Sequence, residues 1–216
     1  MLLAGALLIL AIYNLIAGAM RGGSTYFYHC GFILSILVIS LVLAGYLPLS
    51  LTENSTVQPR TLFVMMMIAL FSATGVARSF FDLSIKAPLL HRITLMLKWG
   101  ALAIIPLTLA LPIALAASLS FATVSLAAFI LLILGYTSWH RELNGGGLFF
   151  LTTLLVSGPA LLVCLAYLGI LQTSAELPQW LLATTALEAV TLGVGLRVSH
   201  RHQALLHIEK QRSQAV

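Results

Sequence analysis

The sequence carries little charge. Asp, Glu, Lys and Arg make up only 8% of its 216 residues, whereas 60% of the residues are apolar and the mean hydropathy is +1.05. Soluble domains typically contain about 25% charged residues, so this composition excludes an ordinary soluble domain. We therefore predict an integral membrane protein of the all-α class, with the lipid bilayer as its surroundings.

Cysteine is also scarce. Cys30 and Cys164 both lie inside apolar runs, where a thiol behaves as a small apolar side chain, so they indicate neither a disulfide framework nor a metal site. The sequence pI is near 9.6. However, the basic residues fall at the ends of apolar segments rather than in a patch with interleaved aromatic residues, so we expect no nucleic-acid partner.

Sequence signatures of membrane pumps and hydrolases are missing too. The last apolar stretch contains no lysine that could bind retinal as a Schiff base, and the chain has no Gly-x-Ser-x-Gly or His-Glu-x-x-His motif. On a helix, His200 and His202 would point about 200° apart, and His207 would lie two turns from His200, so they could not share a metal ion. We predict no catalytic residue, no metal site and no cofactor; any enzymatic activity would belong to a separate output domain.

Apolar stretches divide the chain into seven predicted membrane spans. Each is close to the roughly 20 residues that a helix needs to cross a bilayer. The spans are Leu2–Met20, His29–Tyr46, Leu62–Phe81, Trp99–Ser118, Ala122–Trp139, Leu148–Leu171 and a last stretch that begins at Trp180. The segment Pro48–Arg60 is rich in Pro, Ser, Thr and Asn and is predicted to be a loop. A short interfacial helix is expected to begin near Pro88.

Prolines within these spans predict local distortions. Pro106 and Pro112 are expected to kink the fourth span, and Pro159 the sixth, because proline removes a backbone hydrogen bond and clashes with the preceding turn. The tightest connection is expected at Ser118–Thr123, between the fourth and fifth spans.

Basic residues orient the predicted bundle. The first of them, Arg21, follows the first span, which argues against a cleaved signal peptide and predicts a retained helix with its N-terminus outside. In that orientation, every Lys and Arg except Arg60 falls on the cytoplasmic side. We therefore expect a seven-helix bundle over residues 1–197 and a cytoplasmic helical tail over residues 198–216.

Glu188 is the strongest candidate for a functional residue. It lies eight residues after Trp180, which places it about 12 Å into the membrane at the helical rise per residue. An acid at that depth costs at least ~2.5 kcal/mol on insertion scales, so its side chain should face the bundle interior. Two roles remain open: a switch whose partner or protonation differs between two packings of the last helix, or a buried polar contact that fixes helix register.

Three further polar residues are candidates for ligand coupling. Tyr13 and Asn14 are the expected partners of Glu188, because the first and last helices of a closed bundle are often neighbours. Alternatively, Asn14 bonds a backbone carbonyl of an adjacent helix. Arg78 is also a candidate, although a charge at the membrane interface that pairs with Asp82, four residues later, is the simpler interpretation.

Three stretches of the chain resemble a known family when they are taken together. They are AIYNLIAGAMRGGSTYFYHCGF near the N-terminus, ARSFFDLSIKAPLLHRI after the third span, and TTALEAVTLGVGLRVSHRHQALLHIEKQR at the end. These stretches are similar to the bacterial seven-transmembrane receptors with diverse intracellular signalling modules. The triplet Ala186–Glu188 falls at the corresponding point of that family.

The resemblance implies a signal-transducing domain in a bacterial inner membrane. Such a domain would relay an extracytoplasmic or intramembrane stimulus through its last helix to an output partner such as a histidine kinase or diguanylate cyclase. Its expected partners are a small ligand or an extracytoplasmic sensor domain, the output domain, and a second copy in a homodimer. Neither a sensor nor an output module is expected within these 216 residues, so the chain is interpreted as an excised membrane region or a free-standing version. The alternative function is a small transporter or lipid-handling protein.

Overall fold

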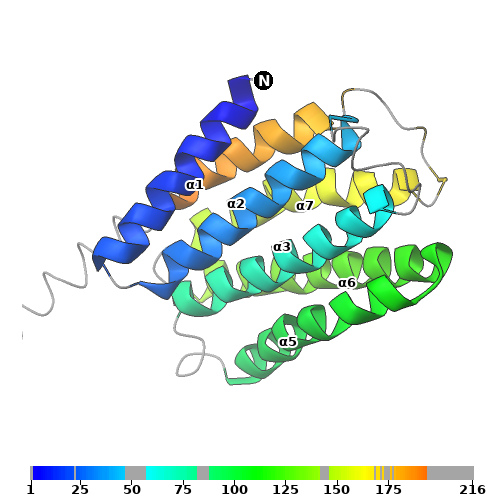
Figure 1. Ribbon diagram of the computed structural model, residues 1–216. Helices are drawn as coiled ribbons and strands as arrows, with labels where there is room; N and C mark the ends of the chain where they lie inside the picture. Colours follow the sequence, from blue (N-terminus) through cyan, green and yellow to red (C-terminus); the bar gives the residue numbers. More distant parts are fainter. Residues whose placement is uncertain are drawn as a thin grey trace, which may run out of the picture.

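The structure, a computed structural model, describes residues 2–21, 23–46, 57–81, 88–141, 146–167 and 178–193, together with residues 169, 170, 172 and 176. Every regular element in these ranges is an α-helix, and six of the helices are long and apolar enough to cross a membrane. They are α1 (Leu2–Arg21), α2 (Ser24–Leu43), α3 (Val57–Phe81), α5 (Pro88–Ala110), α6 (Ile113–His140) and α7 (Gly146–Tyr167) (Figure 1). A further helix covers residues 178–193.

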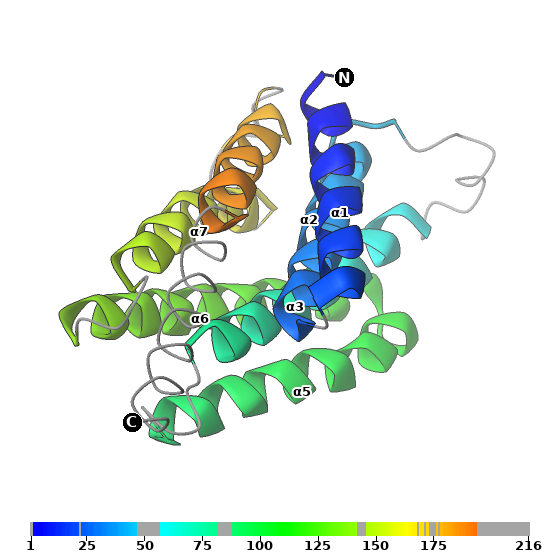
Figure 2. The same ribbon diagram turned by 90° about the vertical axis from the view of Figure 1, so that its left-hand side faces the viewer.

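The helices form a bundle in which α3 is central. It packs against α2, α5 and α6, while α1 packs on α2 and α7 packs on α6. Figure 2 shows α1 and α2 on one side of the bundle and α7 with the 178–193 helix on the other. The two sides meet in a buried cluster in which Ala189 joins Leu7, Ala11, Cys30 and Ile33. The last helix therefore packs directly on the first two.

Apolar side chains cover much of the outer surface, as expected for a protein surrounded by lipid. Ile9, Phe129 and Met96 are each more than 60% exposed. Inside, small residues allow helices to approach closely. A Cβ atom on Gly75 would lie 2.5 Å from Cγ of Tyr28, so only glycine lets the Tyr28 ring lie against α3.

Two helices end in the same glycine-dependent geometry. Gly45 and Gly169 have φ angles of 72° and 73°, and the residue after each donates its backbone N–H to a carbonyl five positions earlier. This Schellman motif satisfies carbonyl groups that a helix end would otherwise leave free. It ends α2 at Leu43 and α7 at Tyr167, a few residues before the predicted ends at Tyr46 and Leu171.

Helix starts were predicted less well. The prediction that the second span begins at His29 is wrong, because α2 already begins at Ser24 and buries Thr25 and Tyr26. The predicted loop Pro48–Arg60 also extends too far, because residues 57–60 belong to α3. The Gln58 side chain donates a hydrogen bond to the Val42 carbonyl and so fixes this first turn of α3 against α2.

The predicted boundary between the fourth and fifth spans is wrong. A single helix, α5, runs from Pro88 to Ala110, so the expected interfacial helix is its first part, and Pro106 lies within it. Pro112 does not kink a span; it precedes α6, where its missing N–H costs nothing. The expected connection at Ser118–Thr123 lies inside α6, since both hydroxyls donate to carbonyls four residues earlier in the same helix. Pro159 lies within α7 as predicted.

Candidate functional site

Glu188 lies in the interior of the bundle, as its depth in the last helix predicted. Its side chain belongs to the helix of residues 178–193, and the residue is 6% exposed. The neighbouring Ala189 packs on α1 and α2. An ionisable side chain this far inside an apolar bundle requires a polar partner.

The partner of Glu188 is His29 of α2. His29 Nε2 lies 3.5 Å from Glu188 Oε2, and His29 is fully buried. On the other side of the imidazole ring, Nδ1 lies 3.2 Å from Oδ1 of Asn14 in α1. Asn14, which is 2% exposed, donates its own Nδ2 hydrogen to the Leu10 carbonyl at 2.8 Å. Three helices are therefore joined by one chain of side chains, Asn14–His29–Glu188.

The donor and acceptor roles in this chain follow from chemistry. The Leu10 carbonyl can only accept, so Asn14 presents its amide nitrogen to Leu10 and its oxygen to His29. That oxygen can only accept, so His29 Nδ1 carries a hydrogen. One further proton placed between His29 Nε2 and Glu188 Oε2 would give an imidazolium and a carboxylate if it were on nitrogen, and two neutral groups if it were on oxygen. Both arrangements leave the pair without net charge, which limits the cost of burial.

Asn14 and Tyr13, the predicted partners of Glu188, lie close to this chain. Asn14 is connected to Glu188 through His29, and its carbonyl bond is to Leu10 of its own helix rather than to an adjacent helix. Tyr13 is half-buried and packs against a cluster that includes Leu192 of the last helix. The structure thus brings the first and last helices together as expected, with α2 between their polar groups.

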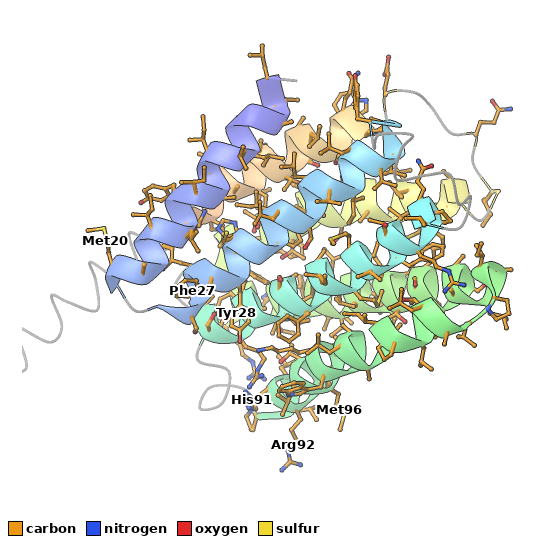
Figure 3. All side chains as sticks on the ribbon, viewed as in Figure 1. Met20, Phe27, Tyr28, His91, Arg92 and Met96 are labelled. Carbon is orange, nitrogen blue, oxygen red and sulfur yellow. The ribbon has the colours of Figure 1, made fainter. Side chains whose placement is uncertain are left out.

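Arg78 lies elsewhere, where α3 meets α5. Its Nη2 atom is 3.4 Å from Nε2 of His91, and its Nε atom is buried without a hydrogen-bond partner. Asp82, its expected partner, lies outside the described residues, as do the three tail histidines. In Figure 3, Arg92 of the same region extends away from the bundle. Arg78 is therefore not part of the Glu188 site.

A second buried polar contact lies beside His29 in the sequence. Lys98 of α5 is only 8% exposed and donates a hydrogen bond of 2.6 Å to the Tyr28 hydroxyl. Its ammonium group also lies over the rings of Tyr28 and Phe71, 4.2 and 4.7 Å from their centroids. Cation–π contacts of this kind stabilise a desolvated ammonium group. Tyr28 and His29, which are consecutive in α2, thus contact Lys98 of α5 and Glu188 of the last helix, respectively.

A cavity of about 140 Å³ lies next to Glu188. Its walls come from α2, α3, α6, α7 and the last helix, and most of them are apolar. Among the described residues that line it, Glu188 is the one ionisable group, and Thr152, Thr153 and Ser157 of α7 add hydroxyl groups. The polar end of the cavity is therefore formed by the residue that also pairs with His29.

Sequence reasoning missed both His29 and Lys98. His29 had been placed at the start of a span, and hence at the membrane surface. The turn near Gly22 offered a usable clue: Asn14 lies eight residues before it and His29 seven residues after it, so in an antiparallel pair of helices they reach the same depth. The predicted fourth span begins at Trp99 and so excludes Lys98, which lies inside α5.

Apolar helices around a buried polar chain and a central cavity define a multi-pass helical membrane protein with an interior site. A family model described as 7TM diverse intracellular signalling matches residues 1–197. The chain belongs to this family, as the resemblance of the three stretches predicted. No curated protein and no solved structure gives a significant match to the chain.

Proposed function

We propose that this chain is the sensing and relay module of a membrane receptor, in which displacement of the last helix carries a signal to a cytoplasmic output partner. One observation supports this most directly: Glu188 of the last helix is joined through His29 to Asn14 of the first. A membrane anchor would not need an ionisable pair in its interior. A two-state relay needs an interaction that is present in one packing of the last helix and absent in the other, and this pair can provide it.

The proposed switch is the contact between His29 and Glu188. In one packing His29 Nε2 and Glu188 Oε2 face each other at 3.5 Å; in the other, Glu188 has a different partner and the last helix has shifted. A stimulus that favours one packing by a few kcal/mol changes the populations of the two packings. About 5.5 kcal/mol is enough to convert a population almost entirely in one packing to one almost entirely in the other. The free-energy contribution of a buried ion pair with imperfect geometry lies within this range.

The proposed orientation has the N-terminus outside and the C-terminus in the cytoplasm of a bacterial inner membrane. Charge distribution along the helices supports it. Arg78 near the end of α3, Arg92 near the start of α5 and Arg141 after α6 lie at the same end of an antiparallel bundle, whereas Arg60 lies near the opposite end, at the start of α3. Basic residues concentrate on the cytoplasmic side of membrane proteins.

Residues 198–216 are proposed to begin the helical connection to the output partner, and they lie outside the described residues. The partner would be a histidine kinase or diguanylate cyclase, acting in a homodimer, and the chain itself would have no enzymatic activity. Glu188, Asn14 and Tyr13 remain proposed coupling residues, and His29 joins them because it connects Asn14 with Glu188. Arg78 remains a proposed coupling residue at a separate place, where α3 meets α5.

The test joins a diguanylate cyclase after Val216, in continuous helical register, and measures cyclic di-GMP in bacterial cells. Glu188→Gln and His29→Gln should each fix the cyclase output at a high or a low level, because both remove the ionisable pair. Val190→Ala, at a half-exposed position of the same helix, should leave the output unchanged. Equal output from all four proteins, at equal expression, would contradict the relay.

The cavity beside Glu188 also suits the alternative of a small transporter, since it places an ionisable residue at an otherwise mostly apolar cavity among the membrane-spanning helices. Purified protein in vesicles separates the two functions. A transporter would move a solute in a manner that Glu188→Gln abolishes, whereas the relay requires altered cyclase output without solute movement.

A further inference from the structure

The cavity next to Glu188 has the dimensions of a binding site for a small molecule. Its volume of about 140 Å³ is close to that of engineered cavities of about 150 Å³ that bind benzene, although this cavity is partly open rather than enclosed. Its walls include Phe32, Leu70, Leu131 and Val156 from four different helices. Apolar surfaces of this kind favour an apolar ligand of about the size of one ring.

Glu188, the one ionisable residue among the described residues of the lining, has an unsatisfied carboxylate oxygen, and the facing His29 Nε2 is unsatisfied as well. Glu188 Oε2 is buried and unpartnered, and its distance of 3.5 Å from His29 Nε2 exceeds the 2.7–2.9 Å of a charge-assisted hydrogen bond. The Thr152 hydroxyl, also in the lining, already donates its hydrogen to the Phe149 carbonyl. Glu188 Oε2 is therefore an acceptor that still needs a donor, which a ligand in the cavity can supply.

We propose that the cavity binds a small neutral molecule with an apolar body and one hydroxyl group, which donates a hydrogen bond to Glu188 Oε2. The proposal takes the arrangement with an imidazolium and a carboxylate. A carboxylate ligand would then meet like charge on Glu188, a hydrocarbon would supply no donor, and an amine would add a positive charge beside the His29 imidazolium. The proposal rests on the proposed function: the ligand hydroxyl replaces His29 as the partner of Glu188 and so favours one packing of the last helix.

The test is photolabelling of the purified full chain in lipid nanodiscs with a benzyl alcohol that carries a diazirine group. Mass spectrometry should locate adducts on the cavity lining, at Val156, Ala160 and Leu181. Benzyl alcohol should compete at least tenfold better than toluene, benzylamine or benzoate at equal concentrations in the bilayer. Adducts spread over lipid-facing residues, or equal competition by toluene or benzylamine, would overturn the proposal.

Two kinds of variant sharpen the test. Ala160→Leu fills the cavity and should reduce labelling at least tenfold, whereas Ala122→Leu, the same change at an exposed position of α6, should not. If Ala160→Leu does not fold, Val156→Phe on the same wall replaces it. Glu188→Gln should keep the labelling site but reduce the preference for the alcohol over toluene about tenfold, because the acceptor loses its charge.

The two proposals fail separately. Specific labelling combined with a cyclase fusion that ignores Glu188→Gln would refute the relay and leave the binding site. A responsive cyclase fusion with no specific labelling would leave the relay and refute the ligand class.

Discussion

Replacing His29 by leucine should strongly destabilise the bundle, because one imidazole serves two other buried groups. The substitution removes the donor to Asn14 and the partner of Glu188, which are 2% and 6% exposed. Removing one member of a buried ion pair costs about 3–5 kcal/mol. Hydrogen bonds inside membrane proteins average only about 0.6 kcal/mol, and the 3.5 Å contact is long. We therefore expect the free energy of unfolding to fall by about 3 kcal/mol, the lower end of that range.

A double-mutant cycle isolates the contact between His29 and Glu188. Replacing both residues with leucine leaves no buried charge without a partner, so the double variant should be no less stable than His29→Leu alone. Glu188→Leu alone leaves His29 Nε2 without a partner and should cost about 2 kcal/mol, so the coupling energy is at least about 2 kcal/mol in magnitude, within the range for residues in contact. Steric trapping in bicelles measures the required unfolding free energies without complete solubilisation of the bundle.

The control cycle pairs His29→Leu with Val190→Ala, which lies on the same last helix but is half-exposed. These two substitutions should be additive to within about 0.5 kcal/mol. If the cycle between His29 and Glu188 is equally additive, the two groups do not interact, and the account of the site given above is wrong.

Three other substitutions test the packing around this site. Asn14→Leu should lower the unfolding free energy by about 1–2 kcal/mol, because His29 Nδ1 loses its acceptor; an unchanged value would rule out that hydrogen bond. Gly75→Ala should cost about 1–3 kcal/mol through its clash with the Tyr28 ring, whereas Gly100→Ala, with open space around it, should cost nothing. Tyr28→Phe should cost about 1–3 kcal/mol because it leaves the Lys98 ammonium group without its acceptor, and combining it with Lys98→Met should restore most of that stability.

Sequence reasoning predicted the class of protein and the burial of Glu188, because both depend on local properties. Membrane insertion follows from apolar content, and the depth of Glu188 follows from the helical rise along one element. Helix ends were harder to predict where Ser and Thr were interpreted as turn residues. In α6, the hydroxyls of Ser118 and Thr123 bond to carbonyls of their own helix, so these polar residues do not interrupt it.

The composition of the site could be predicted only in part, because it depends on how three helices are rotated relative to one another. The sequence predicted that Asn14 and Glu188 contact each other directly, whereas in the structure they are connected through His29. His29 lies between them because α2 places this side chain between Asn14 of α1 and Glu188 of the last helix. The cavity could not be predicted at all. It is lined by side chains of five helices, and its size depends on how these helices pack together.

The contacts of Tyr28 with Lys98 and of His29 with Glu188 both depend on the orientation of α2. Neighbouring residues of a helix point about 100° apart, so α2 presents one side chain to Lys98 and the next to Glu188. Rotation of α2 about its own axis would strain both contacts together. We therefore expect the Lys98 contact to be thermodynamically coupled to the position of the last helix, and coupling of this kind is reciprocal. A molecule that binds at Lys98 would change the position of the last helix, and a partner that holds the last helix would change the affinity at Lys98.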